Sequence, residues 1–146
     1  MVIDVTVAYL HAAMDQEIFM IIDAKVAPIL EKLDPKFSQF KRKNGSLMVR
    51  LLKALYGCRQ SGKLWYDRFT AFLQEMKFVA NKAKRCVWNL MRNNAQITVG
   101  FHVDDNLVTS ESQENLDWFL AAMKKEFKDV KAQKRSCFHF TWYVSG

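Results

Sequence analysis

Two adjacent carboxylates, Asp104 and Asp105, lie between two apolar, β-prone runs in the stretch ITVGFHVDDNLVTS, residues 97–110. Side chains alternate between the two faces of a regular strand, so neighbouring aspartates can serve one site only at a tight turn or a bulge. We therefore expect a hairpin with the doublet at or beside its turn. Because Asp is a favoured turn residue, turn chemistry alone is one explanation of the doublet.

A divalent-metal site is the second explanation. Two like charges this close repel each other unless a cation neutralises them, and Mg²⁺ is commonly held by one or two carboxylates plus the phosphates of a substrate. A two-metal site for phosphoryl transfer, with ions about 3.5–4 Å apart, needs a further carboxylate from elsewhere in the chain. Asp4 is the candidate, because a lone Asp inside the β-prone run VIDVTVAYL is costly to bury unless it binds something.

Hydrophobic periodicity predicts the elements that would position these carboxylates. The clearest helix covers 112–127, with Ser110 and Ser112 as candidate caps and lysines in its last turn, as the helix dipole favours. Asn44 and Gly45 form a strong turn signal before a β-prone run. The other expected elements are strands over 2–10 and 137–144, two strands within 86–103, and helices over 26–33 and 61–77.

This order of strands and helices predicts an α+β fold. Recurring hairpin signals favour helices packed on one face of a largely antiparallel sheet over a doubly wound parallel sheet. The chain has 146 residues, half of them hydrophobic, with two prolines and five glycines. Such a length and composition predict one domain over 1–146 with short connections.

The formal net charge of +7 suggests a polyanionic partner such as nucleic acid or an anionic membrane surface, although many proteins are basic without one. Three scattered cysteines without a C-x-x-C pair predict neither a disulfide framework nor a zinc site, and they are typical of a reducing compartment. No segment approaches the roughly 20 apolar residues of a membrane helix, and the N-terminus lacks the basic region of a signal peptide. We expect an intracellular protein, in a cytoplasmic particle or the nucleus, that is not secreted and binds no membrane.

Three segments resemble blocks of the reverse transcriptase of copia-type LTR retrotransposons. DVTVAYLHAAMDQEIFM, residues 4–20, is similar to the first catalytic block of that family, and LLKALYGCRQSGKLWYDRF, residues 51–69, resembles its distinctive K-x-L-Y-G…W-Y block. FHVDDNLVTS, residues 101–110, resembles the tyrosine-valine-Asp-Asp block, with His102 in place of the more usual tyrosine. The blocks follow the family order and cover nearly the whole chain. The resemblance implies a polymerase palm-like (ferredoxin-like) antiparallel sheet with helices on one face.

The resemblance also implies the chemistry of an RNA-directed DNA polymerase. Asp4, Asp104 and Asp105 would be the catalytic, metal-binding triad, holding two Mg²⁺ ions, with Mn²⁺ as a substitute. Tyr9 matches the aromatic residue that selects deoxynucleotides, and an ordinary core aromatic is the other interpretation. The remaining implied contacts are Tyr56, Gly57 and Gln60 with the incoming nucleotide, and Arg59, Lys41, Arg42 and Lys43 with nucleic acid. A basic run such as 41–43 is more often simply a solvated loop.

The chain also departs from the family pattern. The fingers segment would precede the first catalytic aspartate and the thumb would follow the last block, so we expect both to be largely missing. Lys84 and Arg85 stand where the family usually has Asp-Pro, and CFHFTWYVSG, residues 137–146, lacks the usual aromatic-Leu-Gly motif. Because positioning supplies much of an enzyme's rate, these departures predict weak or no activity for this chain alone.

The resemblance therefore implies a partial reverse transcriptase domain that works by two-Mg²⁺ nucleotidyl transfer. Its expected partners are an RNA or DNA template–primer, deoxynucleoside triphosphates and the rest of a polyprotein, namely integrase and RNase H. Two alternatives stay open. One is a non-catalytic nucleic-acid-binding remnant of a degenerate element, and the other is an inert fragment that folds poorly.

Overall fold

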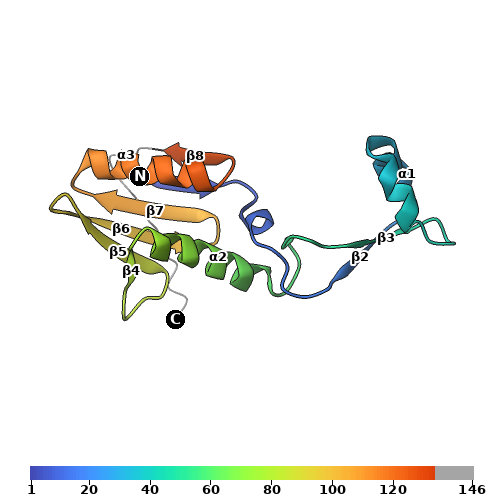
Figure 1. The fold of residues 1–146 in the computed structure, drawn as a ribbon, viewed down its shortest axis with the longest axis horizontal. Coiled ribbons are helices and arrows are strands. Elements are labelled where there is room, and N and C mark those ends of the chain that lie inside the picture. Colours follow the sequence, from blue (N-terminus) through green and yellow to red (C-terminus); the bar gives the residue numbers. More distant parts are fainter. Residues whose placement is uncertain (134–146) are drawn as a thin grey trace, which may run out of the picture. The chain divides into compact units, whose positions relative to one another are not determined.

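A six-stranded antiparallel sheet carries the acidic doublet in the computed structural model, which describes residues 1–133 (Figure 1). The strands follow the order β4-β5-β6-β7-β1-β8 across the sheet. Their bounds are β1 Val2–Val5, β4 Val79–Ala80, β5 Val87–Arg92, β6 Ala95–His102, β7 Asp105–Ser110 and β8 Val130–Gln133. Strands β6 and β7 form the hairpin that the flanks of the doublet predict.

Two helices, α2 (Ser61–Glu75) and α3 (Gln113–Glu126), supply the core that lies against this sheet. The ring of Phe69 in α2 meets that of Phe101 in β6 edge-on, with 4.8 Å between centroids. The ring centroid of Phe72 in α2 lies 5.2 Å from that of Phe127, which directly follows α3. The strands bury side chains at alternate positions: Ile3, Val5, Ile97, Val99, Phe101 and Val108. The predicted architecture, helices on one face of an antiparallel sheet, is confirmed, and the intervening strand residues face away from this core.

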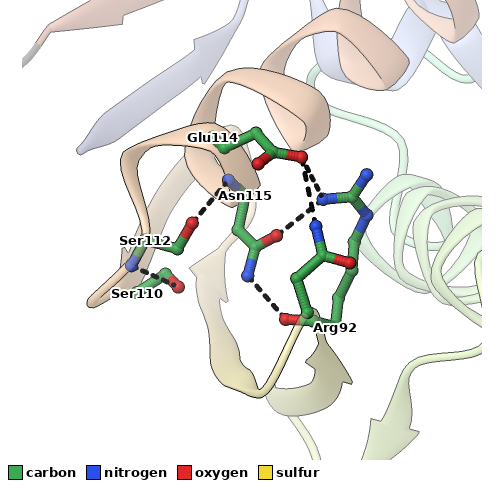
Figure 2. Close-up of polar contacts among 6 residues, drawn as sticks. Arg92, Ser110, Ser112, Glu114 and Asn115 are labelled. Carbon is green, nitrogen blue, oxygen red and sulfur yellow. Dashed lines mark hydrogen bonds and ion pairs between the residues drawn. The ribbon is translucent and has the colours of Figure 1, made fainter.

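A polar clamp joins the β5–β6 hairpin to the start of α3 (Figure 2). Ser112 caps the helix by accepting a hydrogen bond from the Asn115 backbone N–H at 3.3 Å. The Asn115 side chain is fully buried; it accepts from the Arg92 guanidinium at 2.7 Å and donates to the Arg92 carbonyl at 2.9 Å. Since β7 leads directly into this cap, the clamp fixes the far end of the strand that begins with Asp105.

Contacts within the chain divide it into two units, one made of residues 1–8 with the chain from residue 66 onward, and one made of residues 9–65. The sheet and the doublet belong to the first unit. The expectation of one domain over 1–146 stays a prediction.

The second unit contains a two-stranded ribbon and a short helix. Strands β2 (Phe19–Ile22) and β3 (Leu47–Arg50) pair antiparallel, and α1 covers Ala27–Leu33 with a proline in its first turn. Gly45 has φ 84°, as the predicted Asn-Gly turn requires. Short 3-10 helices cover Ala8–His11, at the junction of the units, and Pro35–Phe40. Strand β2 was not predicted, because its four residues are all apolar and show no period-two alternation.

The strand expected over 2–10 is wrong beyond Val5. The ladder ends there: Val7 turns out of it with φ 53°, and the 3-10 helix begins at Ala8. Tyr9 therefore lies on a helical turn. The sequence also missed the polar edge strand β8 and the two-residue β4, since neither is long enough to show a period. The strand expected over 137–144 and the neighbourhood of the missing aromatic-Leu-Gly motif lie outside the described residues.

Candidate functional site

The structure brings Asp4 and Asp105 together. Strand β1 pairs with β7 so that Asp4 lies directly opposite Asp105. Their neighbours Ile3, Val5 and Asn106 are buried in the core, so both aspartates project from the other face of the sheet. Asp4 is half-buried and Asp105 is exposed. Two residues far apart in the chain thus contribute adjacent carboxylates to one face of the sheet.

The hydrogen-bond pattern makes this a close pair. The Val5 N–H donates to the Asp104 carbonyl at 3.2 Å, and the Val108 N–H donates to the Met1 carbonyl at 2.8 Å. Bonded pairs alternate with unbonded pairs along an antiparallel ladder, which makes Asp4 and Asp105 an unbonded pair. Cα atoms of such pairs are about 4.5 Å apart, the closest approach of opposite residues in a sheet. Each carboxylate therefore has a like charge as its nearest cross-strand neighbour.

Asp104 lies in the two-residue turn between β6 and β7, as the hairpin prediction requires. Its carbonyl accepts hydrogen bonds from the Val5 N–H and, at 2.8 Å, from the side-chain amide of buried Asn106. The preceding Val103 has φ 54°, a left-handed conformation that is costly for a β-branched residue. The backbone beside the carboxylate pair is thus both strained and firmly bonded, a combination that is frequent at functional sites.

The described residues fit part of a metal site. Asp4 and Asp105 supply the one or two carboxylates that Mg²⁺ takes from a protein when phosphates complete its shell. The Thr6 hydroxyl lies 3.5 Å from an Asp4 carboxylate oxygen and is the only side-chain donor recorded for it within residues 1–133. In that same range no group of three or more Asp, Glu, His or Cys side chains is arranged to hold a metal ion. The two opposed aspartates fit a cation; the three-carboxylate set stays a prediction.

Tyr9 and Tyr56 come together in the second unit, with ring centroids 4.3 Å apart. Tyr56 is 54% exposed and Tyr9 half-buried, so neither is a fully enclosed core aromatic. Gly57 has φ 94° in the turn that the Cys58 N–H closes by donating to the Leu55 carbonyl. A Cβ added to this glycine would meet no atom within 4 Å. The turn therefore needs glycine for its backbone and leaves open space beside it.

The remaining predicted contacts also lie in the second unit. The side-chain amide of Gln60 lies 3.6 Å from the Met14 sulfur, and Arg59 is exposed in the following turn. Lys41 forms an ion pair with Glu31 at 3.0 Å. Arg42 and Lys43 are exposed at the tip of the loop before β3, where they line a shallow hollow with Asn44. All three basic side chains of this run are thus exposed to solvent, and that of Lys41 is also paired with a carboxylate.

The sequence missed one charged neighbour of the acidic pair. Strand β8 pairs with β1 so that Lys131 lies opposite Asp4 on the side away from Asp105. No signal pointed to it, because β8 itself was not expected and its partner strand is far away in the chain. On the other flank, His102 lies opposite Asp105 across the hairpin.

Comparison with known proteins agrees with the sequence motifs. The family model described as "Reverse transcriptase (RNA-dependent DNA polymerase)" matches residues 1–138. The chain belongs to this reverse transcriptase family, and specifically to its copia-type retrotransposon branch. The match includes Asp4, the doublet and the Leu-Tyr-Gly block around Tyr56.

The relatives include yeast transposon polyproteins. The chain is 26% identical over 125 residues to the transposon Ty1-NL2 Gag-Pol polyprotein of Saccharomyces cerevisiae. The aligned segment covers 86% of this chain and 6% of that polyprotein. The same identity and span relate it to the truncated transposon Ty1-A Gag-Pol polyprotein of that organism, of which it covers 9%. The chain thus spans less than a tenth of the length of these relatives. No solved structure matches it, and no helix within residues 1–133 is long and apolar enough to cross a membrane.

Proposed function

We propose that this chain is the palm-like part of an RNA-directed DNA polymerase, with the face of the sheet opposite the helices as its reaction surface. The observation that carries the proposal is the pairing of Asp4 with Asp105 in a close, unbonded cross-strand pair beside the turn that holds Asp104. Turn chemistry explains a doublet at a hairpin, but it does not explain a third aspartate opposite it on the neighbouring strand β1.

The proposed reaction joins a primer 3′-hydroxyl to the α-phosphate of a deoxynucleoside triphosphate and releases pyrophosphate. Asp4 and Asp105, with Asp104, would hold two Mg²⁺ ions, which when bound would neutralise the charge that develops on the reacting oxygens. The chain's own contribution is to fix carboxylates on rigid strands, where their separation is set by the register of β1 and β7. Positioning of this kind is a large part of catalysis in phosphoryl transfer.

The second unit would bind the nucleotide and the nucleic acid. The paired rings of Tyr9 and Tyr56 offer an aromatic surface, and the open space at Gly57 lets backbone come close to a ligand. Gln60 would complete this nucleotide contact. Exposed Arg42, Lys43 and Arg59, with Lys41, would hold the phosphate backbone through contacts that weaken with salt.

Primer extension with Mg²⁺ or Mn²⁺ tests the proposal. We expect low but measurable incorporation by the full chain, lost in Asp4→Asn and in Asp105→Asn. Asp117→Asn is the matched control, because this exposed aspartate of α3 makes the same charge change away from the sheet face. Equal incorporation by all four proteins, or incorporation that persists without a divalent ion, contradicts the assignment.

A second candidate is a non-catalytic module that binds nucleic acid. The finding that favours it is that no three-ligand metal group exists among residues 1–133. This candidate predicts salt-dependent binding to a template–primer duplex that is unchanged in Asp104→Asn, with no incorporation by any variant. The polymerase proposal predicts instead that the same substitution abolishes incorporation while leaving the duplex affinity at low salt largely intact.

A further inference from the structure

A single line of side chains crosses four strands at the level of the acidic pair. His102 of β6 lies opposite Asp105 of β7, Asp105 opposite Asp4 of β1, and Asp4 opposite Lys131 of β8. Residues in register on neighbouring strands project to the same face, and here it is the face away from the buried core. The two carboxylates are thus flanked by a lysine on one side and a histidine on the other.

Protection of the sheet edge is an ordinary explanation of Lys131. Edge strands commonly carry lysine because its charge prevents pairing with other chains, and β8 is an edge strand of the described sheet. That role would be met at any outward position of β8. The register places the charge opposite Asp4, whose neighbour on its other side, Asp105, is also a carboxylate. Edge protection explains why β8 carries a lysine and leaves this position unexplained.

The ladder also places the two side chains within reach of each other, although the Thr6 hydroxyl is the only side-chain donor to the Asp4 carboxylate in the part of the chain that the structure describes. The Thr6 N–H donates to the Asp129 carbonyl at 3.1 Å, and alternation along the ladder makes Asp4 and Lys131 a bonded pair with Cα atoms about 5.5 Å apart. A lysine carries its ammonium on a flexible four-carbon stem, which spans such a separation. Lys131 is exposed, so nothing in the core holds its side chain elsewhere.

We propose that Lys131 is a positioning residue that neutralises Asp4 when no metal is bound and competes with a divalent cation for the same carboxylate. The inference rests on the proposed function in one respect, namely that a cation binds between Asp4 and Asp105. The inference predicts two opposite effects of Lys131: it stabilises the metal-free protein, and it weakens the affinity for the metal. If Lys131 only protected the sheet edge, neither effect would depend on Asp4.

The test uses the full chain with Lys131→Gln, and with Lys128→Gln as the matched control, since Lys128 is exposed and precedes β8. Unfolding by urea is measured in EDTA for wild type, Lys131→Gln, Asp4→Asn and the double variant. Binding of Mn²⁺ alone is measured from the signal of the free ion. Lys131→Gln removes one positive charge near the bound ion, so we expect it to tighten Mn²⁺ binding by about five- to tenfold. Lys131→Arg keeps the charge and should retain the wild-type affinity.

The expected result is that Lys131→Gln lowers the urea midpoint in EDTA more than Lys128→Gln does, and that Asp4→Asn abolishes this difference. An equal loss in the Asp4→Asn background, or a Mn²⁺ affinity no tighter in Lys131→Gln than in wild type, overturns the inference. The two ideas fail separately. If no variant binds Mn²⁺ at all, the proposed metal site is refuted, and the EDTA comparison alone decides whether Lys131 neutralises Asp4.

Discussion

Removing one charge of the acidic pair should stabilise the metal-free protein. In Asp105→Asn the side chain keeps its size, but Asp4 no longer faces a like charge across the unbonded pair. Two carboxylates about 5 Å apart at a hydrated surface repel each other by roughly 1 kcal/mol, and like charges directly opposite in a sheet destabilise by amounts of this order. Because Asp105 is exposed and solvent screens it, we expect the free energy of unfolding to rise by about 0.5 kcal/mol.

The assay is urea unfolding at low ionic strength, in EDTA and in excess Mg²⁺. Wild type should gain stability from Mg²⁺, because the ion binds the folded state, and Asp105→Asn should gain much less. Asp117→Asn, which removes a charge from the exposed face of α3, should leave both values near wild type. Two results would refute the reasoning: Asp105→Asn less stable than wild type in EDTA, or the same Mg²⁺ stabilisation in both proteins.

Three further predictions concern the elements that hold the site. Val103→Gly should raise the free energy of unfolding by about 0.5 kcal/mol in thermal unfolding, because glycine adopts φ 54° without the strain of roughly 1–2 kcal/mol that valine bears there, and this gain exceeds the entropy of about 0.4–1 kcal/mol that glycine adds to the unfolded chain. A lower melting temperature would show that this entropy and the lost valine contacts outweigh the strain. Ser112→Ala should cost about 1 kcal/mol by removing the α3 cap, whereas Ser110→Ala, outside the helix, should cost clearly less in the same experiment. Burial lowers the pKa of the Met1 amino group, so the folded state binds fewer protons there than the unfolded state and stability should rise with pH from that lowered pKa to about 8. Acetylation of this amine should remove that slope, and a slope that persists would assign it to another group.

Local patterns predicted the hairpin and the helices well. The alternation in residues 97–110 placed the doublet at a turn, and the apolar stripe of 61–77 gave a helix whose Phe69 and Phe72 lie in the core. Helix 112–127 had both a cap and an apolar face, and it formed within one residue of both expected ends. Each of these signals is contained in a short segment, where propensity and periodicity act together.

Long-range register could not be predicted from the same patterns. That Asp4 lies opposite Asp105, and Lys131 opposite Asp4, follows from the insertion of β1 between β7 and β8, and nothing within any one of these segments encodes the pairing. Positive φ angles at Val7 and Val103 were equally hidden, because valine by itself favours extended backbone. In both cases tertiary contacts, namely the backbone bonds from Val5 and Thr6 to the turns around Asp104 and Asp129, decide the conformation.

Asp104 decides between the two candidate functions. Its backbone is held by hydrogen bonds from the Val5 N–H and from the Asn106 side chain, so its Cα is already fixed beside the first strand. Adjacent residues of a regular strand face opposite sides of the sheet, so Asp104 can join an ion held by Asp4 and Asp105 only because it lies in the two-residue turn and not in β7 itself. Loss of Mn²⁺ affinity in Asp104→Asn would show that the third carboxylate joins the site, whereas an unchanged affinity would leave a two-carboxylate site and favour the binding module.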